Sequence, residues 1–140
     1  MKKLKKIFLG LLAVAFVAAG YGFYLFNKKP ADVRVLHAEY ELAAATLVAE
    51  FNKDEPAANK KYLDKVLAVK GNVVDVKTDA TGLATVFLDS GDPLAAVTCS
   101  FYNEEAGAVK NLPKGKEVTI KGMCTGKLMD VVLNKCSINK

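Results

Sequence analysis

A chain of 140 residues is long enough for one ordinary domain together with a membrane anchor. Hydrophobic residues make up 51% of the chain and charged residues 25%, which excludes a disordered polyelectrolyte. The formal net charge of +5 points to nucleic acid when the chain is read as a whole. The position of the charges along the chain decides whether that interpretation holds.

The N-terminal segment has the pattern of a membrane-spanning helix. Residues 7–26 are twenty consecutive residues without a charge, flanked by lysines on both sides. A helix of that length is about 30 Å long, which matches the hydrocarbon core of a bilayer. Four aromatic residues near its end fit an interfacial belt. We therefore predict an uncleaved anchor over residues 1–29, with its span at 7–26 in contact with the lipid bilayer.

A cleaved signal peptide is the alternative interpretation of this segment. Val17-Ala18-Ala19 fits a small-residue cleavage site, but the apolar run continues beyond it and exceeds the usual length of about 7–15 residues. Four lysines precede the span and two follow it. The positive-inside rule then predicts a single-pass protein of the cytoplasmic membrane, which is the inner membrane in a bacterium. Its N-terminus is cytoplasmic and its C-terminal domain extracytoplasmic, that is, periplasmic.

The basic character of the chain belongs to the membrane flanks. Six of the twenty basic residues lie in the first 29 residues, and no acidic residue precedes Asp32. From Pro30 onward the chain has 14 basic and 15 acidic residues, a net charge of −1. Because nonspecific affinity for nucleic acid depends largely on Lys and Arg, this balance disfavours nucleic acid as a partner.

Helical patterns follow a short linker at residues 30–35. Apolar residues at steps of three and four predict a helix from Leu36 to Phe51. Asp54 is suited to cap a second short helix that has Pro56 in its first turn. Together these elements form a helical extension over residues 36–64.

After Lys65 the apolar residues recur with a period of two, which is typical of strands. Five strands are predicted, with Gly71 marking a bend in the long first strand and a helical turn between the third and fourth. The predicted strands are residues 66–76, 83–89, 94–102, 117–124 and 130–138. This layout predicts a mainly β domain at 65–140, a five-stranded OB-fold-like barrel, with an open sheet or sandwich as the alternative.

Several segments carry a family resemblance in their order and spacing. They are Leu47-x3-Phe51-Asn52-x-Asp54-Glu55-x2-Ala58-x3-Tyr62-x2-Lys65, Val97-x-Cys99-x-Phe101, Gly115-x2-Val118-x-Ile120-x-Gly122-x-Cys124 and Val131-x-Leu133-x2-Cys136-x-Ile138. Together they resemble the tRNA anti-like OB-fold family of bacterial proteins, over residues 36–138. The resemblance implies a barrel with a helical N-terminal extension, frequent anchoring or lipidation of the N-terminus, and no catalytic motif. This chain differs from the lipidated members by using a transmembrane span.

OB-folds usually bind ligands on the outer face of their second and third strands, between two flanking loops. Aromatic side chains on that face can stack on a base or a sugar, and lysines can contact phosphate. The residues predicted to bind a ligand are Lys77, Thr85, Phe87, Ser100, Tyr102 and Lys127, with Thr98 beside them. If the helix at Leu36–Phe51 lies across this face, Phe87 becomes part of the core and the site is blocked.

Cys99, Cys124 and Cys136 all lie in predicted strands. The third and fifth strands of an OB barrel are neighbours, so a Cys99–Cys136 disulfide is the first choice and Cys99–Cys124 the second. Three buried thiols are the alternative, and a redox or metal site is a third possibility without a C-x-x-C motif to favour it.

Residues of a catalytic centre do not stand out in the sequence. The common hydrolase, zinc-protease and nucleotide-binding motifs are absent, and the paired carboxylates fall in turns, where they are usually solvated. We therefore expect a non-enzymatic, membrane-anchored binding module without a cofactor. Its ligand is a protein, an oligosaccharide or another molecule at the barrel face. Single-stranded nucleic acid and a thiol-redox or metal site are the alternatives.

Overall fold

The structure is a computed structural model that describes residues 1–28 and 32–139. The chain divides into two compact units, Met1–Ala31 and Asp32–Lys140. The first unit contains helix α1 (Lys2–Asn27), which includes the predicted span at 7–26. By length and composition α1 is able to cross a membrane, and none of its residues is buried within the protein. The predicted linker at 30–35 begins outside the described residues.

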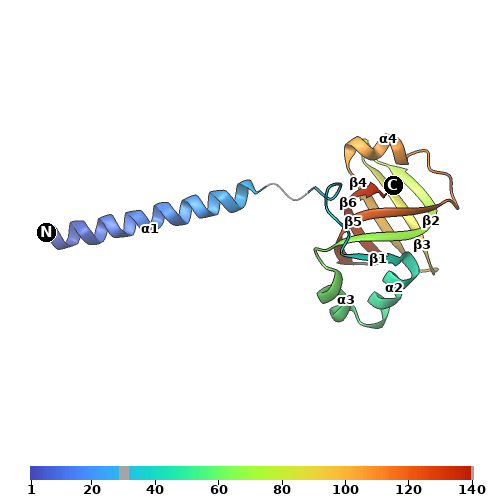
Figure 1. The fold of residues 1–140 in the computed structure, drawn as a ribbon, viewed down its shortest axis with the longest axis horizontal. Coiled ribbons are helices and arrows are strands. Elements are labelled where there is room, and N and C mark those ends of the chain that lie inside the picture. Colours follow the sequence, from blue (N-terminus) through green and yellow to red (C-terminus); the bar gives the residue numbers. More distant parts are fainter. Residues whose placement is uncertain (29–31, 140) are drawn as a thin grey trace. The chain divides into compact units, whose positions relative to one another are not determined.

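The second unit is a closed β-barrel of five strands with a sixth strand at its edge, as Figure 1 shows. Its strands are β1 (Tyr40–Ala43), β2 (Val66–Thr78), β3 (Ala84–Asp92), β4 (Ala95–Phe101), β5 (Glu117–Lys127) and β6 (Val131–Ile138). The order in the sheet is β1-β2-β3-β4-β6-β5, and pairing of β2 with β5 closes the barrel. Strands β4 and β6 run parallel, whereas the other pairs of the barrel are antiparallel. The predicted OB-fold-like barrel is confirmed.

Strand β2 bends where the sequence predicts it. Its first half, up to Asn72, pairs with β5, and its second half, from Val73, pairs with β3 after a register shift. A Cβ at Gly71 would lie 3.1 Å from the Ala44 Cβ and 3.3 Å from the Leu88 Cβ. The missing side chain therefore lets β2 closely approach both β3 and the helix that begins at Ala44, earlier in the chain.

The predicted helix at Leu36–Phe51 is wrong in its first half. Residues Tyr40–Ala43 form β1, which pairs in parallel with β2 from Leu67 to Lys70. Helix α2 begins only at Ala44 and ends at Lys53. Strand β2 offers a free edge here because its pairing with β3 starts at Val73, and main-chain bonds to that edge replace the first turns of the helix.

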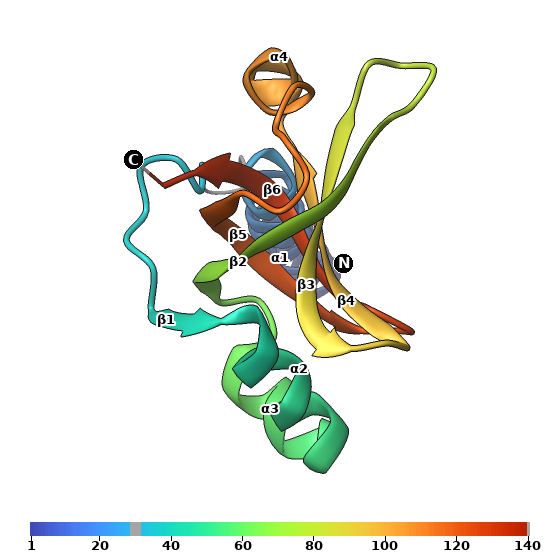
Figure 2. The same cartoon turned by 90° about the vertical axis from the view of Figure 1, so that its right-hand side faces the viewer.

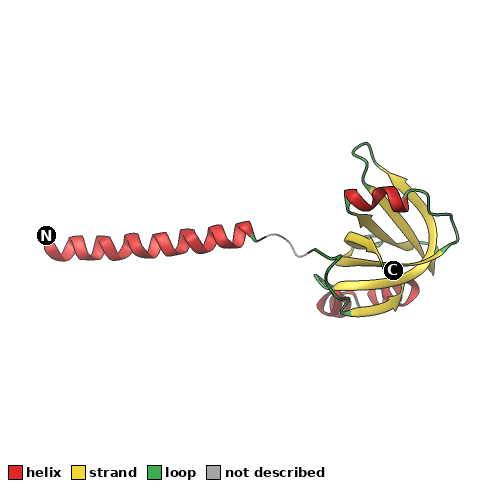
Figure 3. Ribbon diagram, turned by 45° about the horizontal axis from the view of Figure 1, so that its top comes forward, coloured by secondary structure: helices red, strands yellow, loops and turns green. Residues whose placement is uncertain are grey.

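Helix α3 (Glu55–Tyr62) begins as predicted, because the Asp54 side chain accepts a hydrogen bond from the Ala57 backbone N–H at 3.1 Å. Between β4 and β5 lie a short 3₁₀ turn, η1 (Asn103–Glu105), and α4 (Ala106–Val109). Figure 3 shows how these helices flank the strands of the barrel.

Helix α2 plugs one end of the barrel and leaves the outer side of β3 and β4 uncovered. Its buried residues Leu47, Val48 and Phe51 belong to the same hydrophobic cluster as the inward side chains of the strands. Figure 2 shows α2 and α3 at one end of the barrel and α4 at the other. Within the described part of the domain, the face that the sequence predicts to bind a ligand is therefore not covered by the helical extension.

Candidate functional site: the outer face of β3 and β4

The outer face of β3 and β4 gathers most of the predicted ligand residues. Thr85 lies opposite Ser100, and Phe87 lies opposite Thr98. Burial alternates along β3, so its inward neighbours Ala84, Val86 and Leu88 are fully buried while Thr85 and Phe87 are half-exposed. These four outward side chains share one face because residues of a strand alternate between its two sides.

Lys77 extends this face onto β2, where it lies opposite Thr85. Its ammonium nitrogen is 5.1 Å from the centroid of the Phe87 ring, within the range of a cation–π contact. Asp75, opposite Phe87, pairs with Lys114 at 3.3 Å, and this contact lowers the pKa of the Asp75 carboxyl. The face thus combines a flat ring, hydroxyl groups, the Lys77 ammonium and the ion pair of Asp75 with Lys114, a set able to stack a planar group and to contact polar ones.

Tyr102 does not belong to the exposed face. Its hydroxyl accepts a hydrogen bond from the Val33 backbone N–H at 3.2 Å, and the guanidinium carbon of Arg34 lies 4.6 Å from its ring centroid. The structure therefore places Tyr102 against a segment 69 residues earlier in the chain, and its role in ligand binding stays a prediction.

Lys127 is also separated from the face. It lies opposite Val131 at the start of β6, whereas Lys77 lies opposite Thr85 at the start of β3. Val131 pairs with Val97 of β4, and Val97 lies opposite Leu88 rather than at the start of β3, so Lys127 and Lys77 lie towards opposite ends of the barrel. The Lys127 ammonium donates to the side-chain oxygen of Asn52 in α2. The structure does not bring the two lysines to one site.

Residues 32–39, which we call the strap, lie against the outside of the barrel. Lys121 of β5 donates to the carbonyl oxygens of Arg34 at 3.1 Å and of Leu36 at 2.8 Å. Val33 is fully buried although it is outside the interior cluster of the barrel. The backbone N–H of Glu39 donates to the Val66 carbonyl at 2.8 Å, just before β1 begins. The strap therefore connects to the barrel along its whole length.

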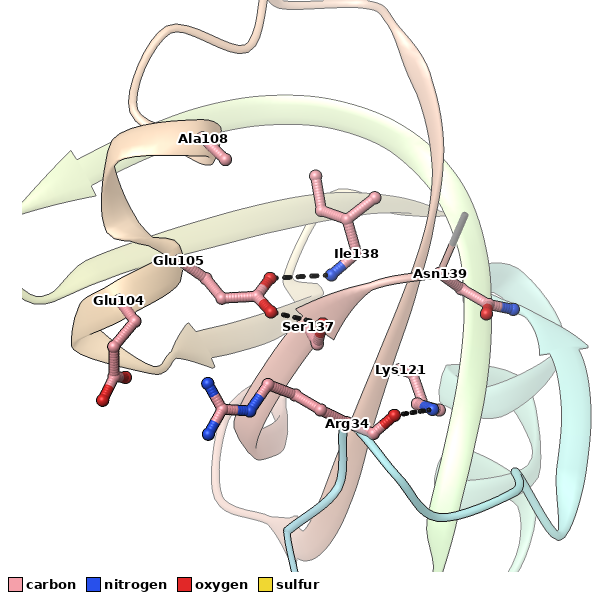
Figure 4. Close-up of a pocket in the computed structure, with 8 residues that line it drawn as sticks. All are labelled: Arg34, Glu104, Glu105, Ala108, Lys121, Ser137, Ile138 and Asn139. Carbon is pink, nitrogen blue, oxygen red and sulfur yellow. Dashed lines mark hydrogen bonds between the residues drawn. The ribbon is translucent and has the colours of Figure 1, made fainter.

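The pocket at the edge of the strap has a volume of about 580 Å³, and Figure 4 shows the residues that line it. Glu105 accepts hydrogen bonds from the Ser137 hydroxyl at 2.7 Å and from the Ile138 backbone N–H at 3.4 Å. Arg34 forms an ion pair with Asp32 at 2.7 Å, and the Arg34 side chain lowers the pKa of Asp32 to about 2. Three of the four charged side chains that line it, those of Arg34, Glu105 and Lys121, already have partners within the protein, so this pocket is better explained as the seam that fastens the strap.

The three cysteines are buried and free in the structure. Burial, and secondarily contact with the Cys99 thiol, raises the pKa of the Cys136 thiol well above its usual value. Burial also raises the pKa of Cys124. The first-choice pair, Cys99 and Cys136, are thus neighbours inside the barrel, and their disulfide stays a prediction. The described residues contain no group of three His, Cys, Asp or Glu side chains positioned to hold a metal ion.

A closed five-stranded barrel with this strand order and a helix that plugs one end defines the OB-fold-like class. The family model named tRNA_anti-like matches residues 1–138, and the chain belongs to that family. This confirms the resemblance that the sequence segments carry.

Solved structures support the same fold. The chain is similar to the crystal structure of a "putative nucleic acid-binding lipoprotein" from Klebsiella pneumoniae, with 20% identity and a TM-score of 0.60. That match covers 80% of this chain and 100% of the other. A "putative aspartyl-tRNA synthetase" from Leishmania major is similar over 74% of this chain and 21% of its own length, with 12% identity and a TM-score of 0.50. No curated protein matches the chain.

Proposed function

We propose that this protein is a non-enzymatic binding module that is anchored in the bacterial inner membrane by α1 and carries its barrel on the extracytoplasmic side. The length and apolar composition of α1 support the anchor, and the lysines before it support the orientation. The family membership supports the OB-fold module. Arg34, Glu105 and Lys121, which line the pocket beside the strap, are engaged in structural contacts, and this favours binding at another surface.

The observation that carries this proposal is the bare outer face with Phe87 at its centre. Phe87 is flanked by Thr98 across the strand pair and by the Lys77 ammonium above its ring. A half-exposed aromatic ring on a β-surface is costly to leave in water and gains free energy when a flat ligand covers it. The expected ligand has a flat face, as a sugar ring or a base does, and groups that hydrogen-bond to the hydroxyls of Thr85 and Ser100.

Single-stranded nucleic acid is the second candidate ligand. The stacking ring and the adjacent ammonium favour it, as does the likeness to a protein described as binding nucleic acid. The net charge of −1 from residue 30 onward opposes it, because phosphate contacts need several cations. The salt dependence of binding separates this candidate from a neutral oligosaccharide.

The test uses the full chain in nanodiscs of zwitterionic lipid. Fluorescent thymidine oligonucleotides and chito- and malto-oligosaccharides are titrated at low and at physiological salt. We expect one class to bind and Phe87→Ala to weaken that binding by about tenfold, in line with the loss of one stacking contact. Lys70→Ala is the matched control, because Lys70 is exposed and paired with Glu117 on another part of the barrel.

Two results would contradict the proposal. The first is equal binding by Phe87→Ala and the unchanged chain, which would move the ligand away from this face. The second is turnover of any probe by the purified protein, which would make it an enzyme.

A further inference from the structure

Two hairpin tips at the α2 end of the barrel expose large apolar side chains. Leu94, between β3 and β4, is 84% exposed, and Leu128 and Met129, between β5 and β6, are 90% and 79% exposed. The parallel pairing of β4 with β6 places Val97 opposite Val131, so the residues just before each strand are also neighbours. We call Leu94, Leu128 and Met129 the tip patch.

The tip patch has a well-defined support. The Asp130 carboxylate accepts hydrogen bonds from the Ala96 backbone N–H and from the Thr98 hydroxyl, both at 2.9 Å, and so ties the two hairpins together. Asn52 of α2 donates to Asp92 at 2.9 Å and accepts from Lys127. Since these bonds hold the tips in place before any partner arrives, docking there costs less ordering entropy than docking on loose loops.

An acidic cleft adjoins the tip patch. It has a volume of about 330 Å³, and its lining includes the carboxylates of Asp89, Asp92 and Asp130 beside Val74 and Leu94. None of these three carboxylates forms an ion pair with a residue in the described ranges 1–28 and 32–139. Lys127, directly before Leu128, donates to Asn52 and forms no ion pair with these carboxylates. The surface therefore presents apolar side chains next to three carboxylates, with Lys127 at the border of the patch.

We propose that the tip patch and its cleft dock a polypeptide that presents a lysine or arginine flanked by apolar side chains. The cation complements the carboxylates of the cleft, and the apolar neighbours cover Leu94, Leu128 and Met129. An anionic bilayer surface or a nucleic acid carries the same sign of charge as the cleft and is repelled by it. This proposal rests on residues other than Phe87 and Lys77, although the two surfaces adjoin, because the Thr98 hydroxyl opposite Phe87 donates to Asp130 of the cleft.

Methionine methyl groups provide a local measurement of docking. The chain has three methionines, of which Met129 lies in the tip patch while Met1 and Met123 lie elsewhere. The full chain is labelled with ¹³C-methyl methionine in zwitterionic nanodiscs and titrated with the short peptide acetyl-Leu-Arg-Leu-amide. We expect a saturable shift of the Met129 signal alone, and no shift with acetyl-Leu-Glu-Leu-amide.

Two variants test whether the shift comes from the proposed surface. Leu94→Ser combined with Leu128→Ser is expected to weaken peptide binding by about tenfold, since it removes most of the exposed apolar contact. Val35→Ser is the matched control, because Val35 is 77% exposed but lies in the strap. Both variants change exposed side chains only, so unchanged thermal unfolding is expected and confirms that the fold persists.

Several outcomes overturn the proposal. Equal shifts with the two peptides would show that docking does not require a cationic side chain. An equal loss of binding in Val35→Ser would show that the peptide does not dock at the tip patch. A Met129 shift caused by phosphatidylglycerol in the nanodisc, without any response to peptide, would assign the tip patch to the bilayer. Self-association that the double variant abolishes, without peptide binding, would assign it to a second copy of the chain.

Discussion

The seam under the strap and the outer face of β3 and β4 contain similar residue types but use them differently. At the seam, Lys121 donates to two carbonyl oxygens and Arg34 is paired with Asp32. On the outer face, the Lys77 ammonium lies over the Phe87 ring, and the hydroxyls of Thr85 and Ser100 face outward. The larger hollow is therefore a structural joint, and the flatter face has groups to offer a ligand.

This difference shows that pocket size is a poor guide to function in so small a barrel. A polar group that already has its hydrogen bonds gains little from a ligand, because binding must first break those bonds. If the comparison is right, substitutions at the seam reduce stability and leave ligand binding unchanged. Substitutions on the outer face weaken ligand binding and leave stability nearly unchanged. The following predictions run from the largest expected effect to the smallest.

The largest expected effect is a change in the free energy of unfolding caused by a disulfide in the barrel interior, which lies beneath both the seam and the outer face. In protein purified from an oxidising compartment without reductant, we expect a Cys99–Cys136 disulfide that stabilises the domain by about 3–4 kcal/mol on the chain-entropy model. Urea unfolding with and without reductant measures the difference. Counting thiols in denaturant gives one free thiol if the bridge is present, and three free thiols would reject it.

The buried valine of the strap provides the sharpest test of the seam. Val33→Asp places an unpaired carboxylate in a fully buried position and is expected to cost about 3 kcal/mol of unfolding free energy. Val35→Asp, at a mostly exposed position of the same strap, is expected to change stability little. Equal effects of the two substitutions in urea unfolding would contradict the burial of Val33.

On the outer face, Phe87→Leu keeps an apolar side chain but removes the flat ring. We expect ligand binding to weaken about five-fold to tenfold because stacking is lost. The free energy of unfolding should change by less than about 1 kcal/mol, since the side chain is half-exposed. Anisotropy titrations and urea unfolding on the same preparation separate the two. A larger loss of stability than of binding would make Phe87 a structural residue.

Tyr102→Phe tests whether Tyr102 serves the strap or a ligand. The substitution leaves the Val33 backbone N–H without its acceptor and is expected to cost about 1 kcal/mol of stability. Because the aromatic ring remains, ligand binding should stay unchanged. Weaker binding in Tyr102→Phe at full stability would return Tyr102 to the ligand site.

The smallest effect is a pH dependence of the strap. The Arg34 side chain lowers the pKa of Asp32 from 3.8 to about 2, so the ionised carboxylate stabilises the strap above pH 3.8. That contribution is lost as the pH falls through about 2, because the carboxyl becomes protonated. The Arg34 amide, which donates to Asp32 at 2.9 Å, should exchange faster over this interval. In the Asp32→Asn variant, the Arg34 amide should not show this increase in hydrogen exchange between pH 3.8 and about 2.

The sequence predicts the barrel well because its signals are local. Alternating burial along β3 and β4, the Asp54 cap of α3 and the bend in β2 all depend on residues close together in the chain. The placement of Thr85, Phe87, Thr98 and Ser100 on one face follows from the same alternation.

The features that the sequence does not predict depend on partners far along the chain. The strap depends on Lys121 and Tyr102, which are 69 to 87 residues away from the groups they contact. The apolar spacing from Leu36 predicts a helix, yet the free edge of β2 captures Tyr40–Ala43 as a strand. The sequence assigns Lys77 and Lys127 to two loops that border the same face, but the distance between those loops depends on how β4 and β6 pair.

The strap also determines where the domain can be cut free of the chain. A protease that cleaves before Asp32 leaves Val33 in its buried site and Lys121 with both of its carbonyl acceptors. Cleavage within the strap must first pull Val33 out of the protein, so the strap is protected for as long as the barrel stays folded. Proteolytic release from the membrane would then yield an intact domain. A shortened chain that starts at Tyr40 would lack the strap, and the barrel surface that the strap covers would be exposed to solvent.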